Sequence, residues 1–124
     1  MQLEALRTID SKDAPALAPD DRPIDLVHLA RTTLGDRSLE REVLQLFDRQ
    51  SSLLIARMRS APPAGLLMLA HTLKGSARGI GAWRVARAAE ALEAADGDVG
   101  GALERLSVVT DEARAVIADL LKAN

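Results

Sequence analysis

One histidine lies among residues whose types and spacing could carry chemistry. His71 is followed by Lys74, Gly75 and Arg78 in a segment with helical apolar spacing. On a helix with about 100° per residue, the apolar positions fall on one stripe that must face the core. This stripe comprises Leu66, Leu69, Ala70, Leu73, Ala77 and Ile80. His71 then points roughly 160° away from the stripe centre, toward solvent. Because a neutral imidazole is nucleophilic near physiological pH, an exposed histidine can accept and pass on a group.

The neighbours of this histidine should leave it accessible to a partner. Gly75 lies one turn later, opposite the core stripe, where glycine costs about 0.5–1 kcal/mol relative to alanine. Lys74 and Arg78 share the face and could stabilise an anion attached to the ring. Leu67 and Met68, one turn earlier, would form an apolar docking patch. Singly, each is an ordinary surface residue. Together they favour reversible phosphorylation over proton transfer, which would need a substrate pocket.

Composition excludes several other kinds of site. The 124 residues include no cysteine and two histidines, which excludes thiol catalysis and argues against a metal centre, so we expect no metal and no cofactor. A net charge of −2 provides no basic field for nucleic acid. No apolar run is long enough to cross a bilayer, and the N-terminus lacks the features of a signal peptide. We therefore expect a cytoplasmic protein that binds neither membrane nor nucleic acid.

The elements that must position His71 are helices. The chain is 48% hydrophobic with 2% aromatic residues, a composition that favours α-helices over a sandwich or barrel. Residues 1–23 are predicted to be an N-terminal arm or linker, because Pro15, Pro19 and Pro23 interrupt it. The arm includes a short amphipathic turn with Leu3, Leu6 and Ile9. Residues 24–124 are predicted to form one helical domain.

Helix-start and helix-stop signals divide that domain. A short helix over 24–34 should end at Gly35, and Asp36 should cap a long helix that reaches residue 59. Its core side is predicted to include Leu39, Val43, Leu46, Phe47, Leu54 and Met58. Further helices are predicted over 62–79 and 82–95, with a tight turn between Gly79 and Gly81, and Asp98 should cap the last helix. Its predicted core stripe is Val99, Leu103, Leu106, Val109, Ala113, Val116 and Leu120. Short loops predict an all-α, antiparallel up-down-up-down four-helix bundle with a short N-terminal helix.

The segment also resembles a known family. His71, Lys74 and Gly75, followed six residues later by Gly81, match the signature of histidine phosphotransfer (HPt) domains. The resemblance extends over about residues 25–120. It covers the HPt family as a whole, to which the phosphoacceptor domains of chemotaxis kinases also belong. It implies that His71 accepts the phosphoryl group on Nε2. It further implies that Lys74 stabilises that group, and that Gly75 makes room for the partner.

The resemblance assigns a further role to a carboxylate on the next helix. In the chemotaxis-kinase domains a glutamate at the position of Glu93 hydrogen-bonds the other ring nitrogen. Two antiparallel helices that turn near Gly79 and Gly81 would bring roughly residue 92 or 93 level with His71. The alternative is that Glu93 belongs to an ordinary surface charge pattern. Arg84 and Arg87 either widen the basic docking surface or are simply solvated, and His28 is given no role.

The predicted function is a phosphoryl relay in two-component signalling. His71 would take a phosphoryl group from a receiver domain or a histidine kinase and pass it to a receiver aspartate. Thr72 stands where sensor-kinase helices commonly carry an acid, so the catalytic groups and Mg²⁺ should come from the partner. The protein would then be a monomeric carrier and not an enzyme. Two alternatives stay open, a phosphoacceptor module of a chemotaxis-type kinase and a helical adaptor for receivers that is not phosphorylated.

Overall fold

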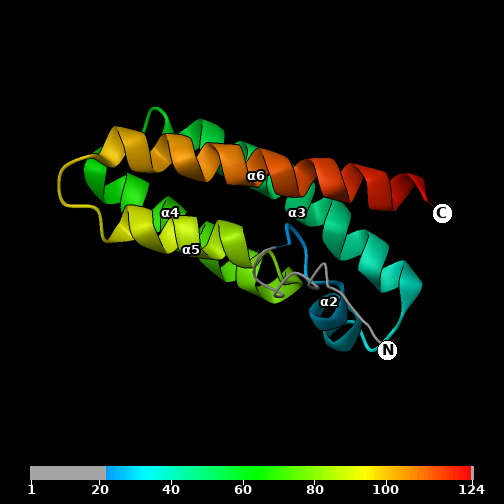
Figure 1. Ribbon diagram of the computed structural model, residues 1–124. Coiled ribbons are helices and arrows are strands. Elements are labelled where there is room, and N and C mark those ends of the chain that lie inside the picture. Colours follow the sequence, from blue (N-terminus) through cyan, green and yellow to red (C-terminus); the bar gives the residue numbers. More distant parts are fainter. Residues whose placement is uncertain (1–21, 124) are drawn as a thin grey trace, which may run out of the picture.

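The structure is a computed structural model that describes residues 22–123, and within them it is all-α. Its helices are α2 (Leu26–Thr32), α3 (Arg37–Met58), α4 (Pro63–Ile80), α5 (Trp83–Glu93) and α6 (Val99–Lys122). The four longer helices lie side by side and α2 crosses one end of the bundle (Figure 1). The predicted all-α bundle with a short leading helix is confirmed. The predicted turn at Leu3, Leu6 and Ile9, and the arm as far as residue 21, lie outside the described residues.

Aspartates begin three of the helices. The side chains of Asp36 and Asp98 accept hydrogen bonds from backbone N–H groups three residues later, at 3.0 Å in both cases. These two N-caps were predicted and are confirmed. Asp25 caps α2 in the same way, by accepting from the N–H of His28 at 3.1 Å. Since α2 begins only at residue 26, the predicted start at residue 24 was two residues too early.

Two turns differ from the prediction. Helix α2 ends at Thr32, because Leu34 and Gly35 both adopt positive φ, at 55° and 75°. The tight turn predicted between Gly79 and Gly81 was wrong in extent, since α4 continues through Gly79. Gly81 alone reverses the chain there, with φ at 81°, and the N–H of Ala82 closes the helix end on the carbonyl of Ala77 at 2.9 Å.

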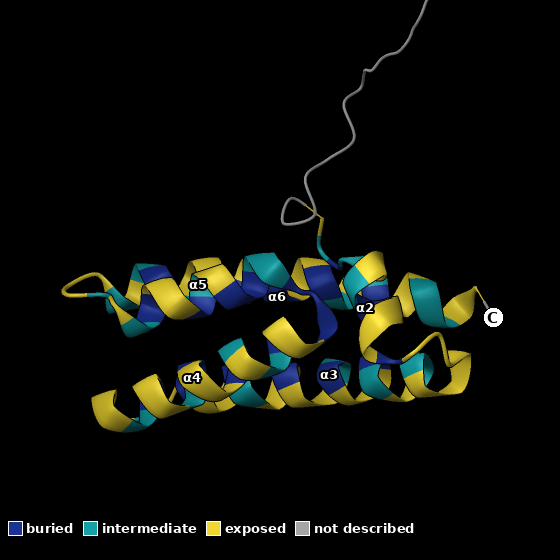
Figure 2. Cartoon of the chain, turned by 90° about the horizontal axis from the view of Figure 1, so that it is seen from below, coloured by how far each residue is buried: buried dark blue, intermediate teal, exposed yellow. Residues whose placement is uncertain are grey.

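The core lies between the four longer helices, and each turns its buried side inward (Figure 2). Most of the predicted stripe on α4 is buried, and Leu69 is half-buried at its margin. Two predicted core positions on α3 were wrong, because Leu39 and Leu46 are exposed. The buried side of α3 runs through Leu44, Phe47, Ser51, Ile55 and Met58, and a helical projection places both leucines more than about 100° from its centre.

The stripe on α6 also lies slightly off its predicted centre. Leu106 and Ala113 are buried as expected. The remaining predicted positions are half-buried and flank the contact. The other buried positions of α6 are Ala102, Ser107, Thr110 and Ile117. The contact is therefore made with smaller and more polar residues than a leucine and valine stripe, which allows α6 to approach its neighbours closely.

Candidate functional site

His71 lies in the middle of α4 and faces away from the core. Its side chain is 72% exposed, while Ala70 and Leu73 on either side are fully buried. The core stripe fixes the rotation of α4, and this rotation alone directs the imidazole toward solvent. Helix α4 is closed at one end by Pro62 and Pro63 and at the other by Gly81. The histidine is therefore displayed on a rigid element with open access.

A carboxylate from the neighbouring helix holds one nitrogen of the ring. Nδ1 of His71 lies 3.0 Å from Oε2 of Glu93, the last residue of α5. The reversal at Gly81 makes α4 and α5 antiparallel and so brings these two residues to the same level. A carboxylate is an acceptor, so this contact favours the tautomer with its proton on Nδ1. Nε2 then carries the lone pair, and it has no hydrogen-bond partner within the described part of the chain.

The sequence predicted that Lys74 could stabilise an anion on the imidazole. In the structure its ammonium is paired with Glu93. Its side chain is 14% exposed, and its ammonium lies 2.6 Å from Oε1 of Glu93. Oε1 is buried, and the contact has the geometry of an ion pair and not of a well-aligned hydrogen bond. Lys74, and to a smaller degree His71, holds the pKa of Glu93 below its ordinary value against the opposing effect of burial. Glu93 is therefore an anion that contacts both side chains.

Replacing Glu93 by Ala should weaken the fold and release the imidazole. The poorly exposed ammonium of Lys74 would lose its counter-charge, at an expected cost of about 1–3 kcal/mol. Because the folded-state pKa of Glu93 is lowered, its contribution is complete above the ordinary glutamate value. That contribution disappears as the pH falls through the lowered value. Denaturant unfolding between pH 7 and pH 3 tests this, and ¹⁵N spectra should show a mixed tautomer for His71 in the variant.

The matched control is Glu90→Ala on the same helix. Glu90 lies 3.6 Å from Arg78, and both side chains are more than half exposed, so its loss should cost less than about 0.5 kcal/mol. A loss of the same size in both variants would show that Glu93 acts only as a surface charge. An unchanged His71 tautomer in Glu93→Ala would contradict the orienting role.

The other predicted cations are arranged differently. Arg78 lies one turn beyond Lys74 and forms the exposed pair with Glu90. Arg84 contacts Glu112 of α6 at 3.3 Å, and it lies about 180° around α5 from Glu93. Arg87 is exposed on α5 and interacts with another group of the protein. The structure thus brings Lys74 and Glu93 together with His71. Arg78 lies about two turns further along the same face of α4, and Arg84 is directed toward α6.

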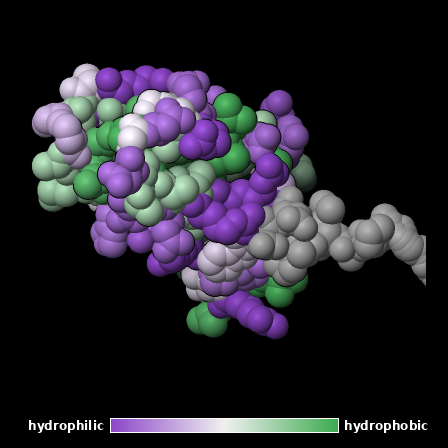
Figure 3. Space-filling model, turned by 60° about the vertical axis from the view of Figure 1, so that its left-hand side comes forward, coloured by the Kyte–Doolittle hydropathy of each residue, from purple (hydrophilic) through white to green (hydrophobic). Residues whose placement is uncertain are grey.

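The exposed face around His71 is partly apolar. Leu67 and Met68, one turn before the histidine, are 43% and 73% exposed. Hydrophobic side chains reach the surface in patches between hydrophilic ones (Figure 3). Gly75 is exposed, and a Cβ added to it would meet no atom within 4 Å. Its lack of a side chain therefore has no explanation in packing within the described residues.

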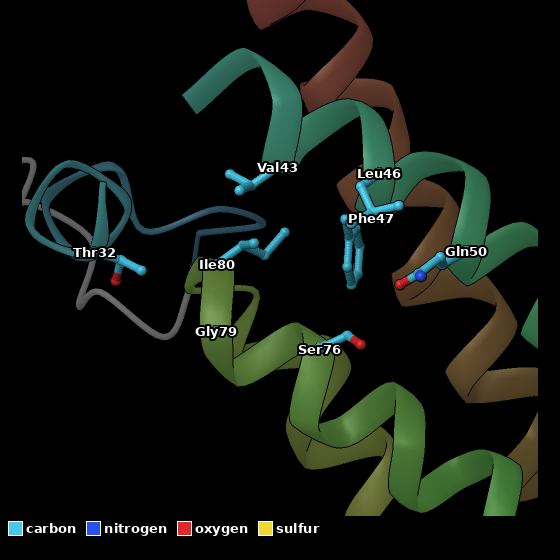
Figure 4. A pocket seen from close by; sticks show the side chains of 8 residues that line it. All are labelled: Thr32, Val43, Leu46, Phe47, Gln50, Ser76, Gly79 and Ile80. Atoms are coloured by element: carbon cyan, nitrogen blue, oxygen red, sulfur yellow. The ribbon is translucent and has the colours of Figure 1, made fainter. Parts of the chain in front are cut away.

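An apolar groove lies between α2, α3 and α4 and was not foreseen from the sequence. It has a volume of about 270 Å³, and Val43, Leu46, Phe47 and Ile80 form its apolar walls, with Thr32 at the α2 side (Figure 4). None of the residues that line it is ionisable. Leu46, which the sequence predicted to face the core, lines this groove instead.

A scan against protein-family models matches the Hpt domain over residues 39–122. The chain belongs to the Hpt family. Hpt domains carry phosphoryl groups on a histidine in two-component phosphorelays. The match includes His71, Lys74, Gly75 and Glu93 but not α2. Searches of curated proteins and of solved structures returned no match.

Within residues 22–123, no group of three or more histidine, aspartate or glutamate side chains could hold a metal ion. No helix in that range is long and apolar enough to cross a bilayer. The site of this Hpt domain consists of the exposed imidazole of His71, the Glu93 carboxylate at its Nδ1 and the Lys74 ammonium at the other oxygen of that carboxylate.

Proposed function

We propose that this Hpt protein relays phosphoryl groups between receiver aspartates, or from a kinase to a receiver, through phosphohistidine at His71. The observation that carries the proposal is that the imidazole of His71 is exposed while its Nδ1 is held by Glu93, which leaves Nε2 accessible. A ring fixed in this way presents its lone pair outward at no further cost in orientation. The proposed setting is the cytoplasm, where the protein would act as a monomer.

The transfer step follows from this geometry. The lone pair of Nε2 attacks the phosphorus of an aspartyl phosphate, and an N–P bond forms as the O–P bond breaks. The aspartate leaves as a carboxylate with the electron pair of the broken bond. The proton on Nδ1 stays in place, and the positive charge that develops on the ring is balanced by Glu93. In the onward step a carboxylate oxygen of a second receiver's aspartate attacks the phosphorus, an O–P bond forms as the N–P bond breaks, and the electron pair returns to Nε2.

The flanking cations would stabilise the phosphoryl group. Arg78 is the more available of the two, since its pair with Glu90 is exposed and 3.6 Å long. Lys74 would contribute from a more buried position, and its ammonium would be shared between Glu93 and the phosphoryl oxygens. The Mg²⁺ and the acidic residues that in-line transfer needs would come from the receiver. The protein is therefore proposed to be a carrier and not an enzyme.

The receiver is proposed to dock over the face that carries His71. Leu67 and Met68 would contact it on one side of the histidine, and the groove beside Leu46 would accept apolar side chains on the other. Arg87 would add positive charge at the edge of the contact, whereas Arg84 faces α6 and would contribute less. Gly75 would let the receiver approach the backbone of α4.

Substitutions of Gly75 should separate stability from transfer. Since a Cβ there has open space around it, Gly75→Ala should raise the free energy of unfolding by about 0.5–1 kcal/mol. Gly75→Gln should also leave the fold intact, but its side chain would obstruct the receiver and slow transfer at least about tenfold. Denaturant unfolding and single-turnover transfer measure the two effects. Transfer by Gly75→Gln at the wild-type rate would exclude the access role.

The experiment that tests the function is transfer from a panel of phosphorylated receivers, followed on a phosphate-affinity gel. An acid-labile, alkali-stable band would show phosphohistidine and identify a partner. Binding of receivers without any labelling would instead favour the adaptor function. Labelling by a kinase domain alone, and never by a receiver, would favour the phosphoacceptor module of a chemotaxis-type kinase.

A further inference from the structure

Helix α2 is held in place by few contacts. It has seven residues, and a helix of that length has little stability of its own in water. Within α2 only Leu29 is buried, and Ile24 and Thr33 are buried on either side of it. The position of α2 therefore depends on a small set of side chains, and polar contacts at its ends carry unusual weight.

Asp25 forms the polar contacts at the beginning of α2. Its backbone N–H donates to the carbonyl of Gly81 at 2.9 Å. One carboxylate oxygen accepts from the N–H of His28, and the other accepts from Nε1 of Trp83 at 2.9 Å. The ring of His28 meets that of Trp83 edge-on, with 4.8 Å between centroids. We call Asp25, His28, Gly81 and Trp83 the α2 latch.

The latch joins α2 to the turn that ends the histidine helix. Trp83 is the first residue of α5, and Gly81 is the residue at which the chain turns at the end of α4. The hydrogen bond from Trp83 is the main reason that the pKa of Asp25 lies below its ordinary value. The carboxylate is thus stabilised as an anion by the contact that fixes the helix.

Helix α2 is also one wall of the apolar groove. Thr32 lines it from α2, opposite residues of α3 and α4 such as Phe47 and Ile80 (Figure 4). The bundle core fixes α3 and α4 relative to each other. The third wall, α2, is held by only two core side chains, Ile24 and Leu29, together with the polar contacts of the latch.

We propose that Asp25 and Trp83 are positioning residues that hold α2 as a wall of the partner groove. They would thereby set the affinity for receivers without touching the phosphoryl group. This inference rests on the proposed function, because it assumes that the receiver uses the groove. A partner that needs α2 in place binds in proportion to the fraction of molecules with α2 docked. Loss of the latch should therefore raise the protein concentration at half-maximal transfer and spare the maximal rate.

Two substitutions remove the same hydrogen bond from opposite sides. Asp25→Asn keeps one oxygen that can accept the N-cap hydrogen bond of α2. It places the NH2 group of the amide against the indole N–H of Trp83, and two donors cannot form a hydrogen bond. Trp83→Phe removes the donor and keeps an aromatic ring beside His28. Each should raise the half-saturating concentration about threefold or more and change the maximal rate less than about twofold. The double variant should be no worse than the more affected single variant.

The matched control is Asp48→Asn, which makes the same carboxylate-to-amide change on the side of α3 that faces away from the groove. Asp48 accepts a hydrogen bond from Nε of Arg114 at 2.7 Å, away from the groove. It should leave the half-saturating concentration unchanged. Hydrogen exchange of residues 26–32 is measured in parallel and should be faster in both latch variants, with α4 unaffected.

The two measurements separate failure of the inference from failure of the proposed function. If transfer by the latch variants matches wild type while exchange in α2 rises, the latch does not serve the partner and the inference is overturned. Unchanged exchange in α2 would overturn it as well, whether or not any receiver labels the protein. If wild type accepts no phosphoryl group from any receiver or kinase, the proposed function fails instead.

Discussion

Replacing His71 with Gln should reduce phosphoryl acceptance to background with every donor that labels the wild type. Glutamine presents an amide where the imidazole presents Nε2, and an amide nitrogen has no lone pair available for attack on phosphorus. The side chain at this position is 72% exposed, and Gln is a good helix former, so the stability should change by less than about 0.5 kcal/mol. Circular dichroism and unfolding of the same sample would show that the fold is retained.

The control for this variant is His28→Gln. His28 is the other histidine of the chain and lies on α2, against Trp83 and outside the histidine face of α4. At saturating donor it should still become labelled to the wild-type extent. Label that persists in His71→Gln, or is lost in His28→Gln alone, would move the acceptor away from α4.

The largest effect on stability is expected for Gly81→Ala. The residue has a φ of 81°, which L-residues with a side chain adopt only at a cost. An added Cβ would also lie 3.0 Å from both the Cβ and the carbonyl oxygen of Asp25. Together these should lower the free energy of unfolding by about 2–3 kcal/mol. Urea denaturation monitored by circular dichroism would measure this loss.

Gly79→Ala is a control with the opposite expected sign. Gly79 lies two residues earlier and is helical, and a Cβ there would meet no atom within 4 Å. The helix should gain about 0.5–1 kcal/mol from alanine. If both variants lost stability equally, the conformation of the turn would not be the cause. If Gly81→Ala were neutral, the close approach of α2 to this turn would be ruled out.

Features fixed by neighbours in the sequence could be predicted. The N-caps Asp36 and Asp98 each depend on a backbone N–H three residues away. The outward direction of His71 follows from the apolar spacing of α4 alone. The position of His71 along the bundle axis, opposite Glu93, follows from the lengths of the two helices and from the turn at Gly81 that joins them. The hydrogen bond itself was expected from the family resemblance.

Features that depend on a choice between partners could not be predicted. Lys74 has a long side chain that could extend into solvent or fold onto α5, and only the packed structure reveals the ion pair with Glu93. Asp25 and Trp83 are 58 residues apart, and no local pattern connects them. The groove needs three helices, so it cannot be read from the exposed leucine on one of them.

The latch also gives the molecule an optical reporter of its own. Trp83 is the single tryptophan and the chain has no tyrosine, so excitation near 295 nm reports on this one indole. The indole N–H is bonded to Asp25 and its ring touches His28, and both contacts shape the emission spectrum. Any event that shifts α2 should therefore change the emission without a label. A stopped-flow trace could then time the arrival of a receiver independently of the phosphoryl transfer that follows it.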